Sequence, residues 1–223
     1  DDTPGYLTFH TNAGATTTDE RLRITSGGQV RIGNANNIAA WGQNNRLQVA
    51  GTDWNTSGVT IAKLANSTAA PNLIFGASRG TSPGTAITNG DRLGYISFTG
   101  DDGTDIHTVG AAIVSGTDAA PSSNSISGTL QFFTGGNQNS NERLLITSTG
   151  TVQPGADATQ DLGSISKRWA NIYSADLQLS NEGSQNDVDG SWGSYTMQEG
   201  ESDLFLINRR TSKKYKFMLE EVQ

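Results

Sequence analysis

The 223-residue sequence contains no cysteine, only two histidines and two methionines, and no long run of apolar residues. Without cysteine the chain has no disulfide, no thiolate nucleophile and no Cys-ligated zinc site. A transmembrane helix needs about 18 or more consecutive apolar residues, so we expect no membrane insertion. Basic runs are also absent, and the net charge is −7. This charge balance argues against nucleic acid and against an anionic membrane surface as partners.

Apolar and charged residues are both scarce. Hydrophobic residues make up 34% and charged residues 17% of the chain, against about 45–50% and about 25% in typical soluble domains. Glycine, serine, threonine and asparagine fill the difference, with β-branched and aromatic residues spaced regularly between them. We therefore predict an ordered, all-β chain that is short of core of its own and needs partner chains to bury enough surface.

The sequence repeats itself at an offset of 122 residues. Residues 19–33 and 141–155 align without gaps, with nine of fifteen positions identical. The segment Gly5–Thr11 matches Gly128–Thr134 at an offset of 123. A repeat of this kind predicts modules stacked along the chain. We expect a fragment that opens near the end of one module and continues through a complete second one.

A change in charge density predicts the second boundary. Residues 1–155 carry 19 charged side chains and residues 156–223 carry 18, which doubles the density in the shorter segment. The predicted domains are 1–33, the end of a preceding β module; 34–155, a full β repeat module; and 156–223, a C-terminal domain that acts as tip, trimerisation domain or both.

Short alternating segments predict the strands. The repeat segments form strands around a glycine-containing turn, at 26–29 in the first copy. The other predicted strands of the first 155 residues are 46–50, 59–64, 72–76, 93–99, 108–115 and 130–134.

The C-terminal domain is predicted to differ. Trp169, Ile172 and Tyr173 follow the spacing of one face of a short helix, with Trp169 and Tyr173 in the core. A strand is expected at 176–179, and a hairpin joins 204–208 to 215–219.

The repeated Glu-Arg-Leu-x-Ile-Thr-Ser-x-Gly-x-Val run resembles repeats of tail fibres and receptor-binding proteins of tailed bacteriophages. Residues 93–103 resemble a strand of the same proteins, and residues 161–173 resemble a segment that precedes their C-terminal domain. Residues 186–196 and the final hairpin are similar to a short terminal domain of marine-phage fibres. The Ser-Asp-x-x-Leu-Lys start of a self-cleaving chaperone is absent, so self-cleavage is not predicted.

The resemblance implies an elongated, intertwined homotrimeric fibre in the virion tail. It implies attachment outside the host cell to a surface glycan or outer-membrane receptor, contact with other tail proteins through a preceding N-terminal part, and no catalysis. The alternatives are a tailspike depolymerase that hydrolyses surface polysaccharide, and a bacterial adhesin or virion decoration module.

Aromatic residues in loops are the candidate glycan ligands, because sugar faces stack on rings. These candidates are Trp192 and Tyr195, expected to be exposed in a Gly/Ser-rich terminal loop, together with Trp41 and Trp54.

No cofactor, no catalytic residue and no resident metal are predicted. The weak metal candidates are two histidines that could form a ring about a three-fold axis, and an acidic loop that lacks the downstream Glu of a calcium site. They are His10, His107, Asp187 and Asp189. A depolymerase would use paired carboxylates instead, and the acidic turns at 101–105 and 199–203 are the places for them.

Overall fold

The computed structural model describes residues 4–12, 14, 18–33, 36–40, 43–66, 68–81, 83–135 and 141–222. These residues form an all-β chain without an α-helix, and none of them forms a helix that could span a membrane. The chain divides into two compact units, Asp1–Asp161 and Leu162–Gln223. The all-β prediction is confirmed, whereas the predicted module boundaries stay a prediction.

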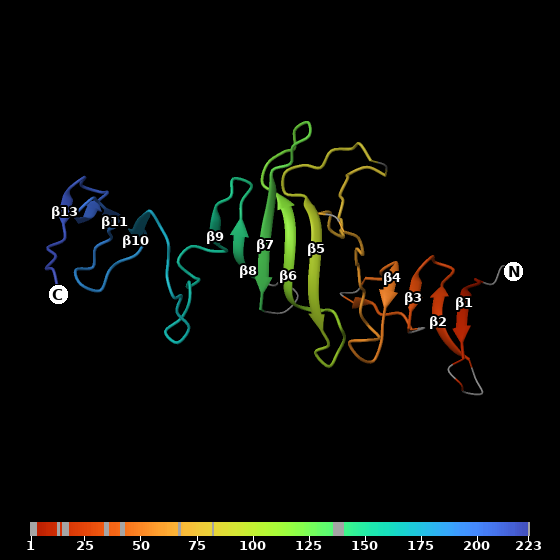
Figure 1. Ribbon diagram of the computed structural model, residues 1–223. Coiled ribbons are helices and arrows are strands. Elements are labelled where there is room, and N and C mark those ends of the chain that lie inside the picture. Colours follow the sequence, from red (N-terminus) through yellow and green to blue (C-terminus); the bar gives the residue numbers. More distant parts are fainter. Residues whose placement is uncertain are drawn as a thin grey trace. The chain divides into compact units, whose positions relative to one another are not determined.

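The first sheet holds β1 (Leu7–Thr11), β2 (Asp19–Ile24), β3 (Val30–Ile32) and β4 (Leu47–Val49) in that order (Figure 1). β1 to β3 form an antiparallel meander, and β4 adds parallel to β3. The β2–β3 turn needs Gly28, whose φ of 74° few L-residues adopt.

The second sheet holds five antiparallel strands in chain order (Figure 1). They are β5 (Arg92–Gly100), β6 (Thr108–Thr117), β7 (Gly128–Thr134), β8 (Asn141–Ile146) and β9 (Val152–Pro154). A small core lies against β6, where Val109, Ala112 and Val114 are almost fully buried, with Tyr95 and Phe133 packed on them.

The repeated segments pair in the same register. Leu22 lies opposite Ile32 in the first copy, and Leu144 lies opposite Pro154 in the second. Each copy has a β-bulge at the same place, after Phe9 and after the residue aligned with it. The turn hydrogen bond from Gly28 N–H to the Thr25 carbonyl recurs between the aligned residues, at 2.9 Å in both copies.

The third sheet lies in the second unit, in the order β10 (Asp176–Ser180), β11 (Ser194–Glu199), β12 (Leu204–Asn208) and β13 (Lys214–Lys216). All neighbouring strands are antiparallel. The predicted C-terminal hairpin is present, although its second strand is three residues long. β11 was not predicted, and it places Tyr195 on a strand.

The apolar faces of the sheets stay open. In the first sheet the registers align Leu7, Ile24, Val30 and Leu47 in one row, and Phe9, Leu22, Ile32 and Val49 in the next. Leu7 is 56% and Leu47 60% exposed, whereas Gln48 on the opposite face is 8% exposed. The sheet of a monomeric protein usually buries its apolar face. In this sheet the apolar face is the exposed one.

The other two sheets also leave apolar side chains exposed on one face, although the buried face of the second sheet is apolar as well. On the second sheet Ile96, Phe98 and Val152 lie exposed on the face opposite Val114. On the third sheet Leu177 and Tyr215 are nearly half exposed, whereas Thr196 is fully buried. Thr196 donates to Gln178 Oε1 at 2.6 Å and accepts from Arg209 Nε at 2.6 Å, so its hydroxyl is satisfied there.

Two predicted strands and the predicted helix are absent. Residues 59–64 and 72–76 form no strand, because no strand of the described part of the chain pairs with them. Residues 167–173 form no helix. Trp169 and Tyr173 are 62% and 93% exposed rather than in a core. An isolated turn of helix is unstable without packing, and these rings stay mostly exposed.

Candidate functional site

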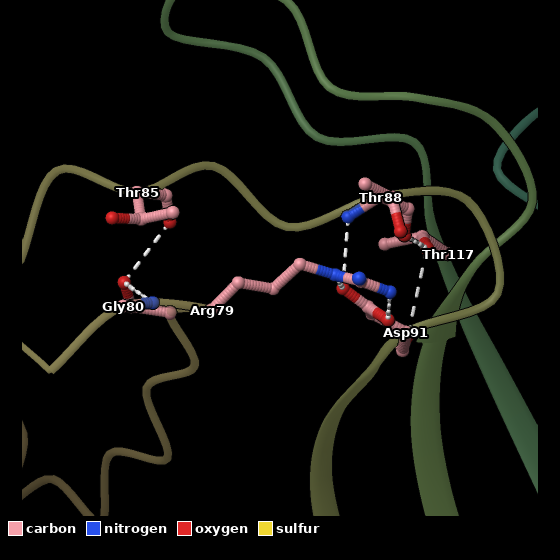
Figure 2. Close-up of polar contacts among 7 residues, drawn as sticks. Arg79, Gly80, Thr85, Thr88, Asp91 and Thr117 are labelled. Carbon is pink, nitrogen blue, oxygen red and sulfur yellow. Dashed lines mark hydrogen bonds and ion pairs between the residues drawn. The ribbon is translucent and has the colours of Figure 1, made fainter.

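An ion pair fixes a long loop at one end of the second sheet (Figure 2). Arg79 donates from Nε and from a terminal nitrogen to the two Asp91 carboxylate oxygens, both at 2.7 Å. The Thr88 N–H donates to the same carboxylate at 2.8 Å, and the Thr117 hydroxyl donates to the Thr88 carbonyl at 2.9 Å. These donors, Arg79 first, lower the pKa of Asp91 to about 2. The loop is therefore fastened to the start of β5 and the end of β6.

A groove of about 590 Å³ lies between this loop and the β6–β7 loop. Its floor includes the buried Ile87, and Pro121 and Ile126 contribute apolar wall. Asn124, which has a φ of 59°, lies at its rim between Ser122 and Ser125. The lining carries no charged side chain. The groove was not predicted from the sequence. Its small residues come from two loops, 77–87 and 121–126, that are separate in the sequence and meet only in the fold.

Trp192 lies just before β11 and is half-buried. The Arg210 guanidinium stacks over its ring at 3.8 Å from the centroid, and Arg210 Nη1 donates to the Trp192 carbonyl at 2.7 Å. A cation over an indole face is held by the ring quadrupole. The ring borders an open depression of about 820 Å³ formed with residues 182–185.

Tyr195 borders a second depression, of about 450 Å³, on the same unit. Its hydroxyl accepts a hydrogen bond from Asn208 Nδ2 at 3.0 Å. Asn181 lines this depression too and accepts from the Gly193 N–H at 2.6 Å. Trp192 lies in the loop before β11, as expected, but is half-buried rather than exposed, whereas Tyr195 lies on β11 and not in a loop. Both rings are fixed, half-buried walls of shallow surfaces.

The loop at 186–191 is held by its own hydrogen bonds. Asp189 Oδ1 accepts three hydrogen bonds. Asn186 Nδ2 and the Ser191 hydroxyl donate at 2.7 Å, and the Ser191 N–H donates at 2.9 Å. These bonds, with the Ser191 hydroxyl first, lower the pKa of Asp189 to about 2. The neighbouring Asp187 takes no part in them. Hydrogen bonds thus use a carboxylate oxygen that a calcium site would need.

The two histidines lie on different strands. His10 pairs across the sheet with Glu20, and His107 Nδ1 lies 3.2 Å from Asp105 Oδ2. The part of the chain that the structure describes contains no group of three or more His, Asp or Glu placed to hold a metal ion.

The acidic turn before β6 uses its carboxylates as turn acceptors. Asp101 accepts from the Gly103 N–H at 2.9 Å. Asp102 accepts from the Thr108 hydroxyl at 2.8 Å and from the Thr104 N–H at 2.9 Å, and these bonds lower its pKa. In the other turn, Asp203 pairs with Lys216 at 2.8 Å. A glycosidase acid needs a raised pKa, the opposite of the direction at Asp102.

The remaining two aromatic candidates are Trp54 and Trp41. Trp54 is 84% exposed on the 53–57 turn, where Asp53 accepts from the N–H groups of Asn55 and Thr56. Trp41 lies outside the described residues. In the C-terminal unit, Trp192 and Tyr195 line two different depressions.

Solved structures match the chain along most of its length. The carboxy-terminal domain of the L-shaped tail fibre of bacteriophage T5 aligns with a TM-score of 0.57 and 16% identity, over 78% of this chain and 74% of that one. The chain has a tail-fibre fold. The same fibre domain with its intra-molecular chaperone domain aligns with a TM-score of 0.63 and 16% identity, covering 85% of this chain.

This tail-fibre fold was predicted from the repeat, and the prediction is confirmed at the level of the fold. The chain spans 55% of the length of the T5 structure that includes the chaperone domain. No protein-family model matches the chain, and no curated protein sequence is similar to it.

Proposed function

We propose that this chain is a non-catalytic, receptor-binding part of a bacteriophage tail fibre. Three copies form a fibre in the virion tail and attach it to a glycan or outer-membrane receptor on the host surface. Other tail proteins are further partners of this fibre. The tail-fibre fold supports the proposal, and the open apolar sheet faces are the observation that carries it.

The exposed area supports the trimer. The chain exposes 17627 Å², whereas a folded monomer of 23.5 kDa exposes about 9,800 Å². Exposed Leu, Ile, Val and Phe side chains on the sheets contribute to this area. A closed three-fold assembly buries the same face of every copy, which removes these surfaces from water.

The depressions beside Trp192 and Tyr195 support glycan binding in the C-terminal unit. Each joins one aromatic wall to amide and hydroxyl groups of Gln185, Asn181 or Ser180. Such a surface offers a ring to a sugar face and polar partners to its hydroxyls. Each contact is shallow, so useful affinity comes from three sites acting together.

The directions of the carboxyl pKa shifts favour binding over hydrolysis. In the described part of the chain, each resolved carboxyl shift is downward. A depolymerase needs one carboxylic acid that stays protonated near neutral pH. The tail-fibre role is therefore preferred over the tailspike depolymerase and over the adhesin or decoration module.

Light scattering of the purified chain tests the proposal first. We expect a mass about three times the 23.5 kDa of one chain, and a trimer that survives unheated gel electrophoresis. A stable monomer would contradict the proposal. A fall in viscosity of host polysaccharide on incubation would support the depolymerase instead.

The receptor part of the proposal is tested with host surface polysaccharide. Trp192→Ala is expected to weaken binding about tenfold, as loss of a central aromatic contact does. Trp169→Ala serves as the matched control, because Trp169 is a 62% exposed tryptophan of the same unit and lines neither depression. Equal binding by wild type and Trp192→Ala would remove this ring from the site.

A further inference from the structure

The segment Val59–Phe75, here called the arm, joins the first sheet to the second. Its sequence alternates as a strand does, yet the structure forms no strand in it. Its large apolar side chains lie in water to an extent seldom found in a folded chain. The exposed fractions are Val59 68%, Ile61 51%, Leu64 97%, Leu73 67%, Ile74 82% and Phe75 49%.

The backbone of the arm has no partner in its own chain along two stretches. Residues 59–62 and 70–76 form no hydrogen bond with another backbone group of the described chain. A β-prone segment with unpaired N–H and C=O groups is a template for another strand. The alternating side chains and the unpaired backbone thus both indicate that the partner is another β-strand.

The arm is anchored at its two ends. Before it, Ser57 donates from its N–H and from its hydroxyl to the Asp53 carbonyl, at 3.1 and 2.6 Å. At its far end Phe75 lies on Gly94 of β5, where a Cβ would come within 3.0 Å of Phe75 Cβ. Phe75 therefore packs on the open apolar face of the second sheet, beside Ile96 and Ile113. Between these two anchors Val59, Ile61, Leu64, Leu73 and Ile74 stay at least half exposed in the single chain.

A second copy of the chain is the partner that fits. Each copy carries both an arm and an open apolar sheet face that Phe75 covers in part, so copies can exchange the two in a ring. The excess of exposed area calls for burial between chains of thousands of Å². Lys63 is the single charged residue of the arm, which also favours an apolar partner.

We propose that residues 59–62 and 70–74 of each chain pair as strands with a second copy and that the apolar side chains of the arm pack on that copy. This inference rests on the trimer proposed above. It adds that the arm, as well as the sheet faces, joins the copies.

Site-specific cross-linking tests the contact, since the chain has no cysteine to react elsewhere. Leu64→Cys is labelled with a benzophenone maleimide, irradiated and run on a denaturing gel. We expect covalent dimers and trimers. Val188→Cys is the matched control, since Val188 is 96% exposed in the C-terminal unit, and it should stay monomeric on the gel.

Hydrogen exchange of the unmodified protein gives a second readout, which no substitution can disturb. Amides of 59–62 and 72–76 are expected to exchange at least about 100-fold more slowly than in an unpaired chain, because only a partner chain can protect them. Trimer mass with free exchange and no cross-link overturns this inference and leaves the trimer standing. A monomer by light scattering overturns both.

Discussion

The two copies of the repeat fold alike and are buried differently. In the first copy the meander continues into the short β4, and its apolar residues stay open, with Phe9 53% exposed. In the second copy the meander continues into β6 and β5, Phe132, which is aligned with Phe9, is half-buried, and the next residue, Phe133, packs on the buried core of β6. The common sequence thus determines the strand pairing and the turn of each copy. The neighbouring strands determine how far the apolar side chains of each copy are buried.

The copies also differ in one polar contact. In the first, Arg23 donates to both Glu20 carboxylate oxygens, at 2.7 and 2.6 Å. In the second, the position of Arg23 is taken by Leu145, and the aligned Glu142 accepts from Gln131 instead. The aligned glutamates therefore accept hydrogen bonds from different places. The donor lies on the same strand in the first copy and on the neighbouring strand in the second.

The largest effect is expected where the copies differ most in burial. Val114→Asp places an unpaired carboxylate where 1% of the side chain is exposed, which costs several kcal/mol. We expect loss of soluble protein, or loss of β signal by circular dichroism. Leu7→Asp, at a residue 56% exposed in the single chain, should keep the β signal and reduce the mass seen by light scattering. A normally folded Val114→Asp chain would refute the difference in core.

A smaller effect is expected where the copies agree. A Cβ at Gly33 would overlap the Ala50 carbonyl oxygen, and one at Gly155 would overlap the Glu142 carbonyl oxygen. Gly33→Ala and Gly155→Ala should each lower the free energy of unfolding by about 1–3 kcal/mol. Gly33 also has a φ of 84°, so its substitution is expected to cost more, and guanidinium unfolding measures both.

The repeat supplies matched controls for these glycines. Gly5 and Gly128 are aligned with each other, and a Cβ at either would meet no atom within 4 Å. Gly5→Ala and Gly128→Ala should leave the unfolding midpoint unchanged. If they destabilise as much as Gly33→Ala and Gly155→Ala, backbone overlap is not the cause.

The smallest effect concerns acid. Hydrogen bonds from Arg23 lower the pKa of Glu20 below its ordinary 4.5, so the pair stabilises the fold above about pH 4.5 and ceases to do so as the pH falls through the lowered pKa. Arg23→Leu, which copies the second repeat, should return the Glu20 pKa toward 4.5 and reduce the loss of stability on acidification. Carbon-detected NMR titration of Glu20 measures this. An unchanged titration would exclude Arg23 as the cause.

Side-chain alternation predicted most strands of this fold, because pairing is local in a meander. β5, β6 and β12 lie within two residues of their expected bounds. The same alternation predicted strands at 59–64 and 72–76, where none forms, because the pattern says nothing about where a partner backbone is. β11 escaped prediction because Trp192 and Gly193 suggested a loop that continues through Tyr195. In fact the strand begins at Ser194.

The candidate site was less predictable than the fold. Aromatic residues in turn-rich sequence suggested Trp192 and Tyr195, but not that Arg210 stacks on the one and Asn208 bonds the other. These partners come from β12 and the turn after it, and only the sheet register brings them near. The Arg79–Asp91 ion pair was equally hidden, since twelve residues separate its members.

The open sheet faces have a kinetic consequence. A single chain gains little by closing its sheets, because the apolar rows of Leu7 and Phe9 find cover only against other copies. On the proposed trimer, the step that buries these rows needs three molecules at once. The yield of native fibre should then depend steeply on the concentration of nascent chains, as for proteins whose stability cannot be separated from protomer concentration. Copies translated side by side on one messenger RNA would reach that concentration where dilute refolding would not.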